Sequence, residues 1–148
     1  MKTSVALCTY NGEKFIHQQL NSILTQTLEV DEIVVCDDGS TDATVSILNA
    51  YKVNYPELFK IYINEQNLRS VKNFEKAISL CENDIIFLCD QDDIWLENKV
   101  EVIVNYFENN SEITTVATNG YGIDDQNNLL NVYSLWDIPT FFAERKIA

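Results

Sequence analysis

The chain has 148 residues, of which 46% are hydrophobic, and its formal net charge is −13. This length suffices for one domain with a sizeable core, and the apolar content argues against intrinsic disorder. With 23 acidic residues against 10 basic ones, the composition argues against a nucleic-acid backbone or an anionic membrane as a partner. Such an acidic balance suits a protein that collects divalent cations.

No apolar run approaches the roughly 20 residues of a membrane span, and the stretch 1–7 is too short for a secretion signal. We therefore expect a cytoplasmic protein, with the inner face of the membrane as the alternative location. The 4 cysteines show no Cys-x-x-Cys spacing and no nearby histidine. Buried thiols in a reducing compartment are expected instead of zinc ligands or disulfides. These cysteines are Cys8, Cys36, Cys81 and Cys89.

Short apolar and β-branched runs alternate with amphipathic segments along the chain. Strands are predicted at residues 3–8, 31–37, 59–64, 85–89 and 113–118. Helices are predicted at residues 13–27, from the N-cap Ser40 or Thr41 to about 55, and at 71–81 and 95–109. This alternation predicts an α/β fold in which helices cover both faces of a parallel sheet.

Polar side chains follow three of the predicted strands, at the point where each strand ends. The first strand ends in 9–11 (Thr-Tyr-Asn), the second in 37–40 (Asp-Asp-Gly-Ser), and the fourth in 90–93 (Asp-Gln-Asp-Asp). Ligands of parallel α/β sheets bind at the carboxyl ends of the strands. A random scatter of acids would not choose strand ends of one sense, so we predict a shared site there.

The acidic segment after the fourth predicted strand suits a cation. In extended backbone, Asp90 and Asp92 point the same way, roughly 6–7 Å apart, whereas Asp93 points elsewhere unless the chain turns. One or two carboxylates, completed by water and substrate phosphates, commonly hold Mg²⁺ or Mn²⁺ beside a nucleotide. The alternative is a solvated acidic turn that caps the following helix.

The other two strand ends suit a nucleoside. Either Asp37 or Asp38 could accept a hydrogen bond from the N3–H of uracil or thymine, or from ribose hydroxyls. One of these two acids is expected to serve only the Asp-Gly turn. The ring of Tyr10 could stack on a base, which is worth roughly 1–3 kcal/mol, or could pack on the first helix. Together the groups describe a site for a nucleoside diphosphate whose departure a cation assists.

Three segments, in this order and spacing, resemble the N-terminal half of family 2 glycosyltransferases: residues 8–12, 35–42 and 89–95. The resemblance extends to about Gly122. It implies a GT-A fold, which is a Rossmann-like, mostly parallel sheet with helices on both faces. It also implies a nucleotide-sugar donor, Mn²⁺ or Mg²⁺, and transfer with inversion at the anomeric carbon. The chain looks most like bacterial hexosyltransferases that add rhamnose or related sugars to surface polysaccharides.

The resemblance assigns roles to residues of this chain. Tyr10 and Asp38 would contact the nucleobase, with Thr9 beside them, and Asp90 and Asp92 would form the Asp-x-Asp element that touches ribose and metal. The donor would be a UDP- or dTDP-sugar and the acceptor a saccharide or lipid-linked molecule. The predicted nucleotide-binding set is Thr9, Tyr10, Asp37, Asp38, Lys72 and Asp90, and the predicted metal ligands are Asp90 and Asp92.

Two departures from the family pattern matter. Arg69 stands where glycine is common, and either Arg69 or Lys72 could meet the diphosphate or be an exposed cation. The family's catalytic base lies in an acceptor-binding half. We therefore expect residues 1–122 to be the nucleotide-sugar-binding core and 123–148 the start of the acceptor-side region. The base is expected beyond Ala148, and Asp124 and Asp125 are expected to be hairpin turn residues.

The sequence patterns leave alternative functions open. Without the base, the chain would be a nucleotide- or divalent-cation-binding module without transferase activity. A phosphoacceptor receiver domain would place its acidic pair after the first strand, and a nucleotidyltransferase would show a glycine-rich loop there; neither pattern occurs. Apolar residues of the tail would favour self-association as a homo-oligomer if they are exposed. They are Tyr133, Leu135, Trp136, Phe141 and Phe142.

Overall fold

The computed structural model describes residues 1–124 and 126–130. The chain divides into two units, Met1–Glu112 and Ile113–Ala148, and the sheet and its helices lie in the first. No helix in the described part of the chain has the length and apolarity needed to cross a bilayer. In chain order the elements are β1 (Thr3–Thr9), α1 (Ile16–Leu24), β2 (Glu32–Asp37), α2 (Thr44–Asn54), β3 (Phe59–Ile63), α3 (Arg69–Leu80), β4 (Ile85–Asp90) and α4 (Lys99–Asn109).

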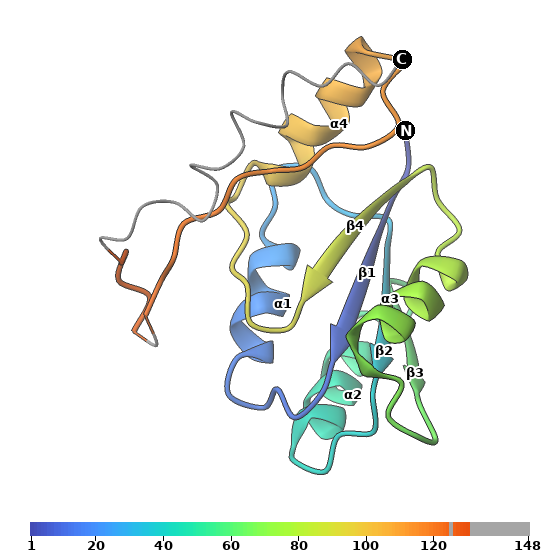
Figure 1. The fold of residues 1–148 in the computed structure, drawn as a ribbon, viewed down its shortest axis with the longest axis vertical. Coiled ribbons are helices and arrows are strands. Elements are labelled where there is room, and N and C mark those ends of the chain that lie inside the picture. Colours follow the sequence, from blue (N-terminus) through green and yellow to red (C-terminus); the bar gives the residue numbers. More distant parts are fainter. Residues whose placement is uncertain (125, 131–148) are drawn as a thin grey trace. The chain divides into compact units, whose positions relative to one another are not determined.

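The four strands form one parallel sheet in the order β3-β2-β1-β4 (Figure 1). β1 is central, and its register pairs Thr9 with Asp37 of β2 and Cys8 with Asp90 of β4. The chain moves outward from β1 to β2 and β3, and then crosses back to add β4 on the other side of β1. Such a switch point is where parallel α/β sheets open a ligand crevice at their carboxyl ends.

Two apolar layers hold helices against the two faces of the sheet. On one face, α1, α2 and α4 pack on Val5 and Leu7 of β1, and on the other face α3 packs on Ala6 and Cys8. Because side chains alternate along a strand, β1 supplies both layers and is buried along its whole length. The predicted α/β fold with helices on both faces of a parallel sheet is confirmed. The four cysteines are free, and three of them are buried.

The predicted fifth strand at residues 113–118 is wrong. The structure has no strand there, and the strand pairing after α4 in the described residues is one isolated antiparallel bridge between Ile123 and Leu129. A β-branched run forms a strand only when a neighbour takes up its N–H and C=O groups. Asp124 closes the turn between the bridged residues by accepting the N–H groups of Gln126 and Asn128. Asp125 and the apolar tail residues at 133–142 lie outside the described residues.

Two helices begin later than their apolar patterns predict. α4 begins at Lys99 rather than Trp95, because the ring of Trp95 packs against Phe87 with the ring centroids 5.5 Å apart. The N–H of Trp95 donates to the hydroxyl of Ser22 on α1, which fixes the loop that follows β4. α1 begins at Ile16 rather than at residue 13, because residues 12–15 form a turn. Tertiary contacts thus replace the first turn of the predicted fourth helix, and a local turn replaces that of the first.

The start of α2 also differs from the prediction. α2 begins at Thr44, and neither Ser40 nor Thr41 caps it. The hydroxyl of Ser40 instead donates to the carboxylate of Asp37 at 2.6 Å. Asp42 accepts the N–H of Thr44 at 2.9 Å and leads the chain into the helix. The Ser40 hydroxyl is therefore used to brace the end of β2.

Candidate functional site

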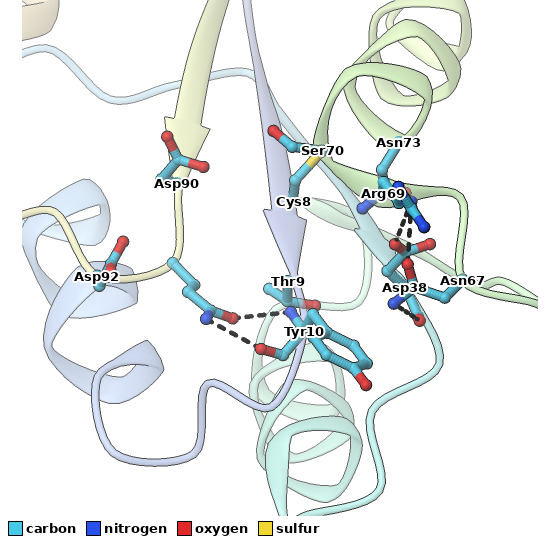
Figure 2. A pocket seen from close by; sticks show the side chains of 11 residues that line it. Cys8, Thr9, Tyr10, Asp38, Asn67, Arg69, Ser70, Asn73, Asp90 and Asp92 are labelled. Atoms are coloured by element: carbon cyan, nitrogen blue, oxygen red, sulfur yellow. Dashed lines mark hydrogen bonds between the residues drawn. The ribbon is translucent and has the colours of Figure 1, made fainter.

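One pocket of about 390 Å³ opens where β1, β2 and β4 end and α3 begins. Figure 2 shows Tyr10 between Asp38, which follows β2, and the pair formed by Asp90 and Asp92. Asp90 is the last residue of β4, and Asp92 lies in the loop after it. Asp38 and Asp92, which the sequence placed on separate strand ends, line the same pocket. Asp37 and Lys72 are not among the lining residues. The lining residues are Cys8, Thr9, Tyr10, Asp38, Asn67, Arg69, Ser70, Asn73, Asp90, Gln91 and Asp92.

Asp37 is fully buried and bonded to protein groups. The hydroxyl of Thr9, its register partner on β1, donates to Asp37 Oδ2 at 2.8 Å. The N–H and the hydroxyl of Ser40 donate to the same carboxylate. A buried carboxylate needs such donors because burial without them is very costly. Asp37 therefore ties together the ends of β1 and β2 and holds the turn that follows.

Asp38 faces the pocket, but most of its carboxylate is already in use. Asp38 Oδ1 accepts the side-chain amide of Asn64 and the N–H of Leu68, at 2.8 and 2.7 Å. Asp38 Oδ2 accepts the N–H of Arg69 at 2.8 Å. Since a carboxylate offers about four acceptor positions, these three bonds leave capacity for one more donor. Asp38 thus anchors the start of α3 and can still receive one hydrogen bond from a ligand.

Two buried asparagines support Asp38, and the sequence interpretation missed both. Asn64 donates to Asn73 Oδ1, and Asn73 in turn donates to the carbonyl of Cys36, each at 2.8 Å. The ammonium group of Lys76 donates to Asn64 Oδ1. A sequence signal existed for both residues: Asn64 ends the third predicted strand, and Asn73 lies one turn before Ala77 on the apolar face of its helix. A polar residue at a core-facing helical position needs buried partners.

Arg69 lines the pocket in a strained backbone conformation. Its φ is 64°, a left-handed value that costs a residue with a side chain roughly 1–2 kcal/mol. This strain explains why glycine suits the position. α3 also begins at Arg69, rather than at residue 71 as predicted. Among the described residues that line the pocket, Arg69 alone carries a positive charge. The exposed Lys72 instead pairs with Glu75 on the same helix.

The carboxylates that follow β4 repel one another. Partial burial, and then the charges of Asp93 and Asp92, raise the pKa of Asp90. Burial and Asp92 also raise the pKa of Asp93, and the nearby Lys99 only partly opposes this. Within the described residues, neither Asp90 nor Asp92 forms an ion pair. Such repulsion between carboxylates is relieved by a bound cation.

The donor set fits a hard divalent cation that brings further ligands with it. No group of three or more His, Cys, Asp or Glu side chains that could hold a metal ion occurs among residues 1–124 and 126–130. Asp90 and Asp92 nevertheless offer two carboxylates to the pocket. Mg²⁺ usually takes one or two carboxylates and completes its octahedron with water and substrate phosphates. The site therefore suits a cation bound together with a diphosphate.

Cys8 is the one thiol among the pocket-lining residues that the structure describes. Burial, followed by the neighbouring Cys36, Asp90 and Asp38, raises the pKa of Cys8 to about 12. The thiolate, rather than the thiol, is the nucleophile in cysteine chemistry. Cys8 is therefore neutral at physiological pH and packs as a small apolar group.

The switch-point sheet and the polar crevice at its carboxyl ends define a Rossmann-like α/β domain of the GT-A type. The family model for glycosyl transferase family 2 matches residues 4–147, and the chain belongs to this family. The predicted fold and family are thereby confirmed.

Individual relatives agree with this assignment. A chondroitin synthase from Escherichia coli is 32% identical over 135 residues, which cover 91% of this chain and 19% of the relative. The dTDP-rhamnosyl transferase RfbG from Shigella flexneri is 38% identical over 100 residues, or 64% of this chain and 34% of the relative. The crystal structure of S. aureus TarS 1–349 in complex with UDP-GlcNAc has a TM-score of 0.69 at 30% identity, covering 84% of this chain and 37% of that one. The chain thus spans between 19% and 37% of these proteins.

Proposed function

We propose that residues 1–122 bind a UDP- or dTDP-sugar and that the whole protein transfers its hexosyl group, with inversion, to a saccharide or lipid-linked acceptor. The proposed location is the cytoplasm or the inner face of the membrane. The observation that carries the proposal is that Asp38 from the end of β2 and Asp90 and Asp92 from the end of β4 line the same pocket. Relatives that include a dTDP-rhamnosyl transferase and a UDP-GlcNAc complex support this choice of donor.

Tyr10 and Asp38 form the proposed base side of the site. The Tyr10 residue is 49% exposed beside the pocket, and stacking on a base contributes roughly 1–3 kcal/mol. The remaining acceptor capacity of Asp38 suits the N3–H of uracil or thymine, a donor that cytosine lacks. Thr9 and Asp37 act beneath them as a buried hydrogen-bonded pair that fixes the two strand ends.

Asp90 and Asp92 form the proposed diphosphate side, where they would hold Mn²⁺ or Mg²⁺ and Asp90 would also reach the ribose. When bound, the ion would neutralise charge that develops on the departing diphosphate. Arg69 and Lys72 are the two candidate cations for the phosphates. Arg69 already lines the pocket, whereas Lys72 would have to leave Glu75.

Transfer also needs a carboxylate that takes the proton from the acceptor hydroxyl as it attacks the anomeric carbon. The acids that line the pocket have other roles, since Asp38 anchors α3 and Asp90 and Asp92 face the proposed cation. As the resemblance to family 2 enzymes implies, we propose that the base lies beyond Ala148. The alternative function, donor binding without transfer, would use the same pocket.

Substitution of a proposed metal ligand tests this function. In Asp92→Ala, we expect the Mn²⁺-dependent affinity for UDP to fall by about 100-fold or more, because even outer-shell partners of metal ligands contribute about 10–100-fold. Isothermal titration calorimetry with and without Mn²⁺ measures this. Glu57→Ala makes the same charge change at an exposed position outside the pocket and should bind as the parent does. Unchanged affinity in Asp92→Ala would remove the metal assignment. If the parent chain binds neither UDP nor dTDP, the proposed donor site is wrong.

A further inference from the structure

Gln91 lies between the two proposed metal ligands, and its side chain is bonded to the loop that follows β1. Its Oε1 accepts the N–H of Tyr10 at 2.8 Å, and its Nε2 donates to the carbonyl of Tyr10 at 3.1 Å. The main-chain pairing between β1 and β4 ends with Cys8 opposite Asp90. The Gln91 amide therefore continues the ladder beyond the last main-chain rung, by holding both polar groups of the Tyr10 residue.

Gly12 provides the space for this arrangement. A Cβ added to Gly12 would lie 2.2 Å from Oε1, 2.5 Å from Cδ and 3.2 Å from Cγ of Gln91, and these are the three heavy atoms nearest to it. Its φ is not left-handed, so an alanine there meets no backbone strain. The absence of a side chain at Gly12 thus leaves room for the Gln91 amide.

The rest of this loop is held from the opposite side. Asn11 has a φ of 49°, and its N–H donates to the hydroxyl of Ser40. The N–H of Gly12 donates to the hydroxyl of Thr44 at the start of α2. The loop after β1 is therefore fixed to the β2 side by these bonds and to the β4 side by Gln91.

We propose that Gln91 is a positioning residue that sets the Tyr10 ring relative to Asp90 and Asp92, with Gly12 as the space that admits it. The inference rests on the proposed function, in which Tyr10 meets the base and the two acids meet the metal and diphosphate. A nucleotide that contacts both the Tyr10 ring and the two acids requires a fixed distance between them. Gln91 fixes this distance, because it stands between Asp90 and Asp92 in the chain and its side chain is bonded to Tyr10.

Amide exchange in the ligand-free protein tests the first part of this inference. In the parent chain, the Tyr10 N–H should exchange slowly by NMR because it is bonded to Gln91. Gln91→Ala removes the acceptor, and Gly12→Ala displaces it, so both variants should exchange this amide about tenfold faster, as expected for a lost hydrogen bond. The melting temperature reports whether each variant is folded. An unchanged Tyr10 exchange rate in folded Gln91→Ala would overturn the inference.

The affinity for UDP with Mn²⁺ tests the functional part. We expect Gln91→Ala and Gly12→Ala each to weaken binding about tenfold, since two hydrogen bonds to Tyr10 are lost. The double variant should be no weaker than either single one, because the added methyl group then has nothing to displace. In a Tyr10→Ala background, Gln91→Ala should have no further effect, since the ring that it positions is absent.

A merely structural role for Gln91 would give a different pattern. Gln91→Ala would then weaken binding equally with and without the Tyr10 ring, and its effect would add to that of Gly12→Ala; either result overturns the inference. Parent-like UDP affinity in Gln91→Ala would also overturn it while leaving the proposed function intact. A parent chain that binds no nucleotide would overturn both.

Discussion

The two ends of the sheet treat their acidic residues differently. At the amino end, Glu32 begins β2, and its carboxylate pairs with the ammonium group of Lys60 at 2.6 Å. The hydroxyl of Ser4 and the N–H of Glu82 complete its hydrogen bonds. The charge at this end is therefore matched by groups of the chain itself.

At the carboxyl end, Asp90 and Asp92 line an open pocket without an ion-pair partner among the described residues. Partial burial, and then the carboxylates of Asp93 and Asp92, raise the pKa of Asp90. Asp37 lies at this same end but resembles Glu32, because chain groups satisfy it. The bonding of an acid, rather than its place at a strand end, therefore separates the structural acids from those available to a ligand.

The largest expected effect comes from breaking the structural acid at the pocket end. Asp37→Ala would leave the hydroxyl of Thr9 and two donors of Ser40 without their acceptor. Orphaned buried donors of this kind are expected to cost about 3 kcal/mol of the free energy of unfolding. Urea denaturation measures this, with Asp37→Asn as the milder control because it keeps one acceptor oxygen. A loss below about 1 kcal/mol in Asp37→Ala would show that Asp37 is not a structural acid.

A smaller effect is expected at the amino end of the sheet. There, Glu32→Gln should lower the free energy of unfolding by about 2 kcal/mol near pH 7. Burial raises the pKa of Glu32, but hydrogen bonds from Lys60 and Ser4 outweigh burial and hold it below its ordinary value. As the pH falls below the unfolded value of about 4.3, the unfolded chain therefore takes up a proton before the folded one does. The Glu32 carboxylate therefore contributes its full share to the free energy of unfolding above about pH 4.3. This contribution is lost as the pH falls from that value to the pKa of Glu32 in the folded chain.

Denaturation curves between pH 7 and pH 3 test this sign. The difference in free energy of unfolding between the parent and Glu32→Gln should shrink as the pH falls through this window. Glu57→Gln, at an exposed position, should show no such change. A difference that is constant with pH would contradict the assignment of Glu32 as a charged structural acid.

A still smaller change is expected at Arg69, where substitution by glycine should raise the stability of the fold and lower the affinity for UDP. Arg69→Gly removes the backbone strain that a φ of 64° imposes on a residue with a side chain. The substitution should therefore stabilise the fold by about 1 kcal/mol. If the guanidinium group meets the diphosphate, the same change should weaken UDP binding about tenfold, as for a lost hydrogen bond to a charged group. Melting curves and calorimetry on one preparation measure both quantities.

Two further substitutions separate the effect of backbone strain from the effect of the guanidinium charge. Arg69→Ala keeps the backbone strain and loses the charge, so it should weaken UDP binding without stabilising the fold. Lys72→Ala should leave binding unchanged if Arg69 is the cation that meets the diphosphate. The reverse pattern, with parent-like binding in Arg69→Ala and weak binding in Lys72→Ala, would move that role to Lys72.

Much of the fold follows from local sequence patterns, and each wrong prediction has a specific physical cause. The predicted strands β1 to β4 and the order of strand and helix are confirmed. The predicted starts of α2 and α4 are wrong because the Ser40 hydroxyl bonds back to Asp37 at the end of β2 and the Trp95 N–H bonds to the distant Ser22. No local pattern shows that the β-branched run at 113–118 lacks a strand partner, and adjacent acids such as Asp37 and Asp38 look alike until their partners are known.

Local sequence is enough to predict the alternating elements, the family and the strand ends where acids gather, because hydrophobic period and motif order are properties of neighbouring residues. The role of each acid depends instead on the folded packing. The register of β1 against β2 places the Thr9 hydroxyl on Asp37, and the start of α3 bonds to Asp38. The loop after β4 places Gln91 on Tyr10 and leaves Asp90 and Asp92 without ion-pair partners among the described residues. These pairings join residues far apart in the chain, so the packing of the sheet, rather than local sequence, determines them.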